Sequence, residues 1–418
     1  MRYKYAHPEF FDGVPRPDFK SLSDNLVIYG AGFQGLLAAY LLDQQGIKAL
    51  CFGDQDVKKQ GTTYYGLPVY SPEEMKKRYP DALAIVTPYS IRPAFQYVRD
   101  ELGYGERTVT PFSLFLEFDS IGFDDLPEIP DWYHSDSLPY HMEMFFRKCI
   151  NLLTDESFFS LDICVSEVCN LRCKNCTSLM PCYQKPRHFE LEDVFQDINT
   201  VLCERKLHHL AIEGGETFLW KPLPNLLRKL CKLQNLMEII VITNGTILPD
   251  SELLEALRHP KVVVQISDYG AISRKDELLP ILKKEHISYW LTSQKWSELS
   301  AFHKEKLRGE ELSFVVNDCC KLGGNGDPYL VDGMLFRCPI QGNLHRLNIY
   351  KSDPKDFVDI RQSDTAKVQR EISEFMDVKQ QPRIIELCRH CNGRGHSGIE
   401  VPPAEQLAPG EKIQVRFE

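Results

Sequence analysis

Five short apolar segments, alternating with helical stretches, constrain the fold of this chain more than any other feature. The segments are LDICV, HLAIE, EIIVIT, VVVQIS and ISYWL, between residues 161 and 291. Helical patterns separate them around residues 191–204, 221–233, 251–258 and 273–285. Repeated strand–helix units of this length predict an α/β fold with a parallel sheet, closed as a barrel or partial barrel. We therefore expect the working groups at the carboxyl ends of the strands.

A smaller strand–helix series precedes this one. Residues Leu26–Tyr29 form an apolar run, GAGFQG follows as a turn, and LLAAYLLDQQG has a helical pattern that ends at Gly46. KALCF and DALAIVTP continue the alternation, which predicts a small parallel-sheet domain. Residues 119–140 are acidic, contain prolines and show no hydrophobic periodicity, which indicates a linker.

Composition excludes several classes of protein. The 418 residues include 49 Lys+Arg and 59 Asp+Glu, and a formal charge of −10 argues against partners such as nucleic acid or a membrane surface. No run approaches the roughly 18 apolar residues of a membrane span, and the polar start lacks the apolar core of a signal peptide. We expect a cytoplasmic protein whose 14 cysteines form no disulfide framework. Cys149, Cys203 and Cys231 stand singly, and we expect them to be buried.

Three cysteines with close spacing follow the first strand of the larger series. They read Cys169-x3-Cys173-x2-Cys176. Three thiolates on one loop can hold three irons of a [4Fe–4S] cluster, and a missing fourth ligand leaves one iron open to bind a small molecule. A structural zinc site is the alternative, but zinc requires four ligands, and the neighbours Cys164 and Cys182 do not make the paired spacing.

The ends of the next three strands carry small or polar residues. EGGET ends the second strand, ITNGT the third and QISDYG the fourth. Glycines let the backbone approach a ligand closely, although EGGET is also compatible with a simple turn. Asn244 and Ser267 lie at strand ends that share one edge of the sheet, where each either contacts a ligand or caps the following helix.

From about Ser160 to Leu291 the chain resembles the radical S-adenosylmethionine (radical SAM) enzymes. The resemblance implies a partial (β/α)6 TIM-type barrel in which Cys169, Cys173 and Cys176 hold a [4Fe–4S] cluster. It places Gly214, Gly215 and Glu216 against the methionine amino group of S-adenosylmethionine, and Asn244 and Ser267 against its ribose or carboxylate. The family often has an aromatic residue before the third cysteine, where this chain has Asn175.

The resemblance also implies a chemistry. The reduced cluster injects an electron into the sulfonium of S-adenosylmethionine, which yields methionine and a 5′-deoxyadenosyl radical that removes a hydrogen atom from a small-molecule substrate. A reductant such as flavodoxin or ferredoxin is the implied electron-donating partner. The protein supplies positioning, tuning of the cluster and exclusion of side reactions.

A second cysteine group lies near the C-terminus. It contains Cys319, Cys320, Cys338, Cys388 and Cys391. Thirteen or twelve residues separate Cys319 or Cys320 from Gly333, and Gly333-x4-Cys338 and Cys388-x2-Cys391 follow. This pattern resembles the twitch module or a shortened SPASM domain, which implies an auxiliary [4Fe–4S] cluster. A zinc knuckle, with four cysteines or with three and His390, is the alternative. One of the adjacent cysteines is then surplus: either a catalytic thiol that returns a hydrogen atom to a substrate radical, as in radical epimerases, or an inert buried thiol.

The glycine-rich turn of the first series suggests a second ligand site. Gly30-x-Gly32-x-x-Gly35 lies between a strand and a helix, and Asp54 follows the next strand. This context is the one that a nucleotide site requires, with phosphate at the helix N-terminus. The continuation of the chain resembles small Rossmann-like domains that bind nucleotide sugars. A scaffold domain without a ligand is the alternative.

Together these patterns predict five segments and one reaction class. The segments are a Rossmann-like nucleotide-binding domain over residues 20–120, a linker over 121–155, the radical SAM partial barrel over 156–312, a cysteine-rich auxiliary segment over 313–400 and a tail over 401–418. The predicted function is a radical SAM enzyme, an oxidoreductase or epimerase, acting on a sugar or nucleotide sugar. A radical SAM peptide or natural-product maturase and a non-catalytic Fe–S protein are the alternatives.

Overall fold

The chain forms two units, Met1–Glu156 and Ser157–Glu418, and each is described by itself. The computed structural model describes residues 17–19, 21, 25–88, 91–116, 145, 149, 152, 159–203, 205–292, 296–297, 301–302, 306–314, 328–376, 384–391, 400–413 and 415–417. The predicted linker over residues 119–140 lies outside the described residues, as do Cys319 and Cys320.

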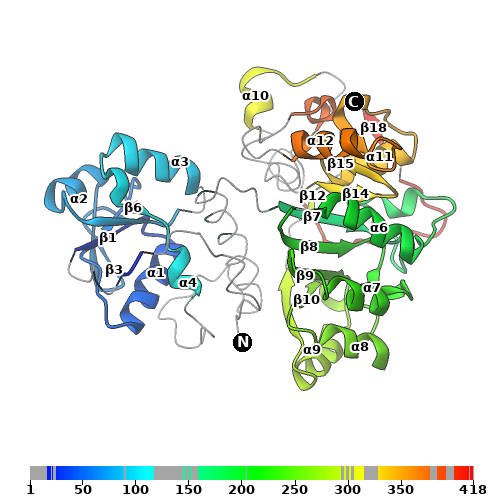
Figure 1. The fold of residues 1–418 in the computed structure, drawn as a ribbon, viewed down its shortest axis with the longest axis horizontal. Coiled ribbons are helices and arrows are strands. Elements are labelled where there is room, and N and C mark those ends of the chain that lie inside the picture. Colours follow the sequence, from blue (N-terminus) through cyan, green and yellow to red (C-terminus); the bar gives the residue numbers. More distant parts are fainter. Residues whose placement is uncertain are drawn as a thin grey trace. The chain divides into compact units, whose positions relative to one another are not determined.

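A six-stranded sheet organises the first unit, in the order β3-β4-β2-β1-β5-β6 (Figure 1). The strands are β1 (Leu26–Tyr29), β2 (Phe52–Gly53), β3 (Thr63–Tyr64), β4 (Leu67–Tyr70), β5 (Leu83–Val86) and β6 (Thr108–Val109). Strand β1 pairs in parallel with both β2 and β5, so the chain adds strands first on one side of β1 and then on the other. Only the edge strand β3 is antiparallel to its neighbour.

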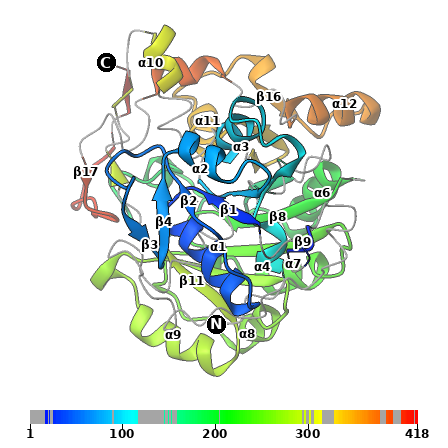
Figure 2. The ribbon, with the colours of Figure 1, turned by 90° about the vertical axis from the view of Figure 1, so that its left-hand side faces the viewer.

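A buried strand and a buried helix form the centre of this unit. The helices are α1 (Phe33–Gln44), α2 (Pro72–Arg78), α3 (Ile91–Gln96) and α4 (Phe112–Leu116) (Figure 2). Strand β1 is fully buried, and nearly every residue of α1 is buried as well, which explains its almost uniformly apolar sequence. The predicted strand and helix are confirmed. The KALCF run lies along β1, with backbone hydrogen bonds at Leu50 and Cys51, although β2 itself spans only Phe52–Gly53.

An eight-stranded sheet organises the second unit, in the order β11-β10-β9-β8-β7-β14-β15-β16. Its first five strands in the chain are β7 (Phe159–Cys164), β8 (Leu207–Glu213), β9 (Leu236–Thr243), β10 (Val262–Ser267) and β11 (Ser288–Thr292). They pair in parallel, and α6 (Leu191–Leu202), α7 (Leu223–Leu230), α8 (Ser251–Leu257) and α9 (Lys275–Lys284) connect them. The predicted strands and helices of this series are all confirmed.

The other edge of this sheet comes from the C-terminal part of the chain. Strand β14 (Tyr329–Val331) pairs in parallel with β7, and β15 (Met334–Phe336) and β16 (Phe357–Asp359) continue as antiparallel strands. Helices α10 (Gly309–Phe314), α11 (Pro339–Arg346) and α12 (Thr365–Phe375) belong to the same part. A sixth parallel strand therefore lies beside the first strand of the series, not beyond the fifth. Closure into a partial barrel stays a prediction.

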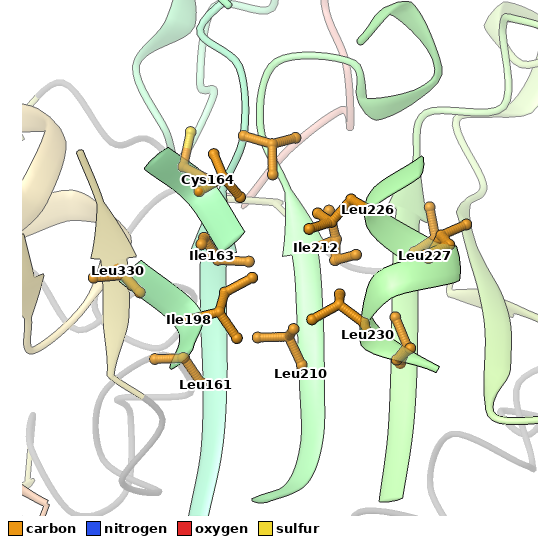
Figure 3. Packing of buried hydrophobic residues seen from close by; sticks show 14 of the residues in the cluster. Leu161, Ile163, Cys164, Ile198, Leu210, Ile212, Leu226, Leu227, Leu230 and Leu330 are labelled. Carbon is orange, nitrogen blue, oxygen red and sulfur yellow. The ribbon is translucent and has the colours of Figure 1, made fainter. Parts of the chain in front are cut away.

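The helices cover one face of this sheet with aliphatic side chains (Figure 3). Leu210 and Ile212 of β8 pack in one buried cluster with Leu226 and Leu230 of α7. Ile198 of α6 belongs to the same cluster. Because side chains alternate along a strand, the packing of this face assigns the intervening residues to the opposite face.

Two small pairs of strands lie outside the main sheets. Strand β12 (Trp296–Ser297) pairs with β17 (Glu400–Val401), and β13 (Ala301–Phe302) pairs with β18 (Arg416–Phe417). Among the described helices, none combines the length and the apolar character that crossing a membrane requires.

Candidate functional site

The three-cysteine loop begins where β7 ends, at the carboxyl edge of the parallel sheet. Cys173 is buried, and Cys169 and Cys176 are half-buried. Burial raises the pKa of Cys169 to about 12 and that of Cys173 to about 11, and neighbouring cysteine thiols add to both shifts. These thiols therefore stay protonated at neutral pH unless a cation binds them, so metal uptake releases protons.

The loop after β8 lies directly against the cysteine loop. The backbone N–H of Gly215 donates to Ser166 O at 2.7 Å, and that of Glu216 donates to Val168 O at 2.9 Å. A Cβ added to Gly214 would lie 2.6 Å from Ser166 O, and one added to Gly215 would lie 2.2 Å from Val168 O. The two glycines are therefore required for this close approach, and their predicted contact with the cofactor stays a prediction.

The side chain of Glu216 links the ends of β8 and β9 through hydrogen bonds. Its side chain is fully buried and accepts hydrogen bonds from Thr243 Oγ1 at 2.6 Å, Asn244 N at 2.8 Å and Phe218 N at 3.0 Å. Burial raises the pKa of this carboxyl group, although the three donors oppose the shift. The carboxylate thus points toward the end of β9, and its predicted role toward the methionine amino group stays a prediction.

Asn244 contacts the cysteine loop. Its Nδ2 donates to Asn170 Oδ1 at 3.1 Å and lies 3.9 Å from Cys169 Sγ, and its Oδ1 accepts from Thr246 N at 2.9 Å. Ser267 ends β10, is half-buried and hydrogen-bonds Tyr269. The structure thus brings Asn244 to the cysteines, as the strand order predicts, and contacts of both residues with a ribose or carboxylate stay predictions.

Tyr269 is a neighbour of the cysteines that sequence reasoning missed. Burial raises the pKa of its phenol, and the nearby thiols of the cysteine loop add to the shift. Its ring packs edge-on against Trp296 with the centroids 5.4 Å apart. The one sequence feature that could have indicated Tyr269 is its position two residues after Ser267, at the end of a strand. The aromatic surface beside the cysteines therefore comes from the end of β10 instead of position 175, where Asn175 is buried.

A network of charged side chains joins the cysteine loop to the C-terminal part of the sheet. Arg346 of α11 donates to Glu167 Oε1 at 2.5 Å and to Asp332 Oδ2 at 2.9 Å, and Glu167 is only 4% exposed. Arg187 pairs with the same Asp332, and both guanidinium groups lie over the ring of Phe189. These partners are separated by up to 179 residues, so the sequence pattern does not indicate them.

Two cysteines of the second group, Cys338 and Cys388, pack against a small apolar cluster. Cys338 caps α11 by accepting from Gln341 N at 3.5 Å, and Cys388 lies in a short 3-10 helix that ends just before Cys391. Cys182, from the segment after the cysteine loop, packs with Cys338 and Cys388 against the same cluster. The cluster comprises Leu179, Ile340, Leu344, Ile385 and Leu387.

The remaining cysteines correct one expectation. Cys149 is buried and Cys231 is half-buried, but the expected burial of Cys203 is wrong, because its side chain is exposed. Cys203 follows α6 with a φ of 41°, where the helix ends and the chain turns outward. None of the twelve cysteines in the described part of the chain forms a disulfide.

The donor chemistry of the three-cysteine loop suits an iron–sulfur cluster. Thiolates are the ligands of such clusters, and the three thiols lie close together, because Cys173 and Cys176 raise the pKa of Cys169, and Cys176 raises that of Cys173. Across the described residues, however, no three His, Cys, Asp or Glu side chains are placed to hold a metal ion together. Each thiolate of an iron–sulfur cluster binds a different iron, so the three sulfurs need not converge on a single ion.

The face of the sheet opposite the helices carries polar side chains among apolar ones. Pairing places Ser160 beside His209 and His209 beside Glu238. Further along the strands, Glu213 follows two residues after Ala211, and Gln265 of β10 pairs with Trp290 of β11, whose Nε1 donates to Gln265 Oε1 at 3.1 Å. The apolar Ala211, Ile240 and Val263 also lie on this face. The term polar face is used below for its members Ser160, Asp162, His209, Glu213, Glu238, Gln265 and Trp290.

The glycine-rich turn of the first unit has both structural and open positions. Gly30 has a φ of 107°, and a Cβ on Gly35 would lie 2.0 Å from Gly30 O, so both positions require glycine. A Cβ on Gly32 would meet nothing within 4 Å. Asp54 accepts from Ala31 N at 2.7 Å, so its carboxylate closes the turn.

Comparison of the sequence with models of protein families identifies one superfamily. Residues 163–268 match the Radical SAM superfamily, a stretch that runs from β7 to just beyond β10 and includes the cysteine loop and the residues at the ends of β8 and β9. Residues 163–268 form a radical SAM domain. Such a domain implies a [4Fe–4S] cluster and S-adenosylmethionine as cofactors.

Individual relatives of this radical SAM protein match only in part. A GTP 3′,8-cyclase from Peptoclostridium acidaminophilum is 34% identical over 92 residues, which is 22% of this chain and 28% of that protein. The chain thus aligns with little more than a quarter of the length of the curated relative it matches.

Two solved structures give weak overlays. The structure of BtrN in complex with AdoMet and 2-DOIA is 15% identical, with 61% of this chain and 100% of that chain covered, at a TM-score of 0.39. Streptococcus suis SuiB is 16% identical, with 55% of this chain and 49% of that chain covered, at a TM-score of 0.28. At these scores neither overlay bears on the function of the present protein.

Proposed function

We propose that this protein is a radical SAM enzyme that reductively cleaves S-adenosylmethionine and removes a hydrogen atom from a small-molecule substrate. One observation carries the proposal. The three-cysteine loop and the loops after β8, β9 and β10 meet at one edge of the sheet, joined by bonds from Gly215 to Ser166 and from Asn244 to Asn170. A site that requires a cluster and an organic cofactor side by side needs such a convergence.

Each group at this edge has a role in the proposal. Cys169, Cys173 and Cys176 hold the cluster, which supplies the electron for cleavage of the bound cofactor. Glu216 keeps the ends of β8 and β9 in register, which positions Asn244 beside the loop. Tyr269 offers an aromatic surface beside the cysteines, a type of surface on which an adenine ring stacks.

The polar face supports a hydrophilic substrate. Its acidic members Asp162, Glu213 and Glu238 accept hydrogen bonds, and an amide and an imidazole lie among them. Hydroxyl groups of a sugar can hydrogen-bond to such a surface, which an apolar substrate cannot do. We therefore favour a sugar or nucleotide sugar, with epimerisation or oxidation at a carbinol carbon.

A substrate screen tests this choice against a peptide maturase. The protein, loaded with iron and sulfide without oxygen, is incubated in D2O with dithionite, S-adenosylmethionine and either a nucleotide-sugar panel or unrelated peptides. An accepted sugar raises 5′-deoxyadenosine formation above the level without substrate, and an epimerised product carries solvent deuterium. Stimulation by a peptide alone would overturn the sugar assignment.

The second cysteine group supports an auxiliary [4Fe–4S] cluster. Cys338, Cys388 and Cys391 would be its ligands, together with Cys319 or Cys320. Two clusters correspond to about eight irons per chain and one cluster to about four. The wild type should therefore bind about eight irons, and Cys388→Ala about four, with Cys231→Ala as the matched control. Zinc in place of the second set of irons would overturn this assignment.

The first unit supports a Rossmann-like nucleotide site as a second candidate. No side chain caps the N-terminus of α1, and the position facing Gly32 is open. A phosphate at this helix end would accept its N–H groups. Isothermal titration with a nucleoside diphosphate tests the idea. Binding that is lost in Gly32→Asp supports the site, and heats equal to the buffer blank contradict it.

A further inference from the structure

A C-terminal segment of this chain runs along the three-cysteine loop. Residues 404–411, here named the C-terminal strap, lie antiparallel to residues 172–174, with Cys173 opposite Gln406. The N–H of Leu407 donates to Arg172 O at 2.8 Å, and the N–H of Lys174 donates to Glu405 O at 2.8 Å. The backbone of the loop is therefore paired on both sides of Cys173.

The side chain of Gln406 reaches the sulfur of this cysteine. Its Oε1 accepts from Arg172 N at 2.7 Å, which fixes the orientation of the amide. Its Nε2 then donates to Ala404 O at 2.6 Å and to Cys173 Sγ at 3.3 Å. Ala404 is fully buried, so the near end of the strap is anchored in the protein.

Charged groups hold the strap at both of its ends. Lys174 Nζ lies 2.8 Å from Glu405 Oε1 and 3.7 Å from Glu411 Oε1. Arg172 donates to Glu411 O at 3.1 Å, and the Glu411 side chain accepts from Ala408 N at 2.7 Å. These pairs are partly exposed and contribute modestly, so the backbone pairing and the Gln406 amide carry the contact with the loop.

We propose that Gln406 is a positioning residue that sets the reduction potential of the cluster through its hydrogen bond to Cys173. The inference rests on the proposed function, in which Cys173 is a cluster ligand. A donor to a ligating sulfur withdraws negative charge from it and favours the more negative, reduced state of the cluster. Gln406 therefore makes reduction easier, and its removal makes the potential more negative.

The test is a potential titration of the anaerobically loaded protein, followed by electron paramagnetic resonance. Gln406→Leu removes the donor at similar volume. Gln406→Glu keeps an acceptor for Arg172 N but turns an anionic oxygen toward the sulfur. The potential should fall from wild type to Gln406→Leu and further to Gln406→Glu. The matched control Glu405→Gln loses an ion pair of the strap and should keep the wild-type potential.

Cleavage rates provide a second readout. With dithionite, 5′-deoxyadenosine formation by Gln406→Leu should fall about 10- to 100-fold, as expected for groups that support metal ligands. The stronger reductant titanium(III) citrate should restore much of this rate, which a purely structural defect would not allow.

Each outcome decides between explanations. Equal potentials in the wild type and both variants at equal iron content would overturn the inference. Loss of iron from both variants would overturn it too, since Gln406 would then only hold the loop in place. A wild type that binds no iron or does not cleave S-adenosylmethionine would instead defeat the proposed function, so the two failures are distinguishable.

Discussion

At the scale of single residues, the carboxylate of Glu216 connects two strand ends with three hydrogen bonds in a fully buried position. All three partners are donors. An anionic carboxylate offers enough acceptor sites for all of them, whereas an amide places an NH2 group against at least one donor. The negative charge therefore suits this position despite the cost of burying it.

Replacing Glu216 by glutamine should destabilise the second unit. The expected loss is about 1–3 kcal/mol, because a buried donor such as Asn244 N then faces an NH2 group. Urea unfolding of the iron-free protein measures it, and Glu277→Gln, at an exposed side chain, should keep the wild-type urea midpoint. Equal effects of the two substitutions would contradict the role assigned to Glu216.

Replacing Gly215 by alanine should force the cysteine loop away from the end of β8. The added Cβ would lie 2.2 Å from Val168 O, a distance that the backbone does not tolerate. Hydrogen exchange should become faster over residues 165–176 in Gly215→Ala. In Gly32→Ala, where the Cβ enters open space, exchange over the same residues should be unchanged. Unchanged exchange in both variants would show that the close approach is not needed.

The sequence predicts which residue types occur at this site, but not which residues they contact. The spacing of Cys169, Cys173 and Cys176 directly after a strand indicates a cluster loop, and Asn244 at a later strand end indicates proximity to it. The glycines 214 and 215 also suggest a ligand contact, while the structure adds that they make room for the loop backbone. Such roles depend on distances between loops that local sequence patterns do not encode.

At the scale of secondary structure elements, Asp332, in the turn between β14 and β15, forms ion pairs with three arginines. Arg346, Arg187 and Arg361 contact its carboxylate. Burial alone raises the pKa of Asp332, but the hydrogen bond from Arg346 and the three positive charges outweigh burial, so the pKa is lowered overall. The ionised carboxylate thereby stabilises the folded protein.

This lowered pKa predicts a loss of stability in acid. The contribution of Asp332 is fully present above its unfolded pKa of about 3.9 and disappears as the pH falls through its lower folded pKa. Urea midpoints measured from about pH 6 down to about pH 3 should show the advantage of wild type over Asp332→Asn shrinking. A constant advantage would contradict this assignment.

The elements of the parallel series follow from hydrophobic periodicity, so β7 to β11 and their helices were predictable. The position of β14 was not, because a three-residue strand has a weak local signal and pairs with β7 across more than 150 residues. The same reason hides the C-terminal strap, which was predicted only as a tail and contacts Cys173 from 233 residues away.

At the scale of the whole molecule, each of the two units carries its own candidate site. The second unit places the cysteine loop, the ends of β8 to β10 and the polar face on one sheet. The first unit supplies a glycine-rich turn before an uncapped helix. The cysteine pattern indicates the superfamily because its chemistry depends on a short loop, whereas the substrate depends on surfaces assembled from many segments.

The central claim is that Cys169, Cys173 and Cys176 hold a cluster that cleaves S-adenosylmethionine. Its most direct test is 5′-deoxyadenosine formation by the anaerobically loaded protein with dithionite and S-adenosylmethionine. Wild type and Cys231→Ser should both form the product, since Cys231 lies on another element, and Cys176→Ser should form none. No product from iron-loaded wild type, or equal amounts from Cys176→Ser, would contradict the account.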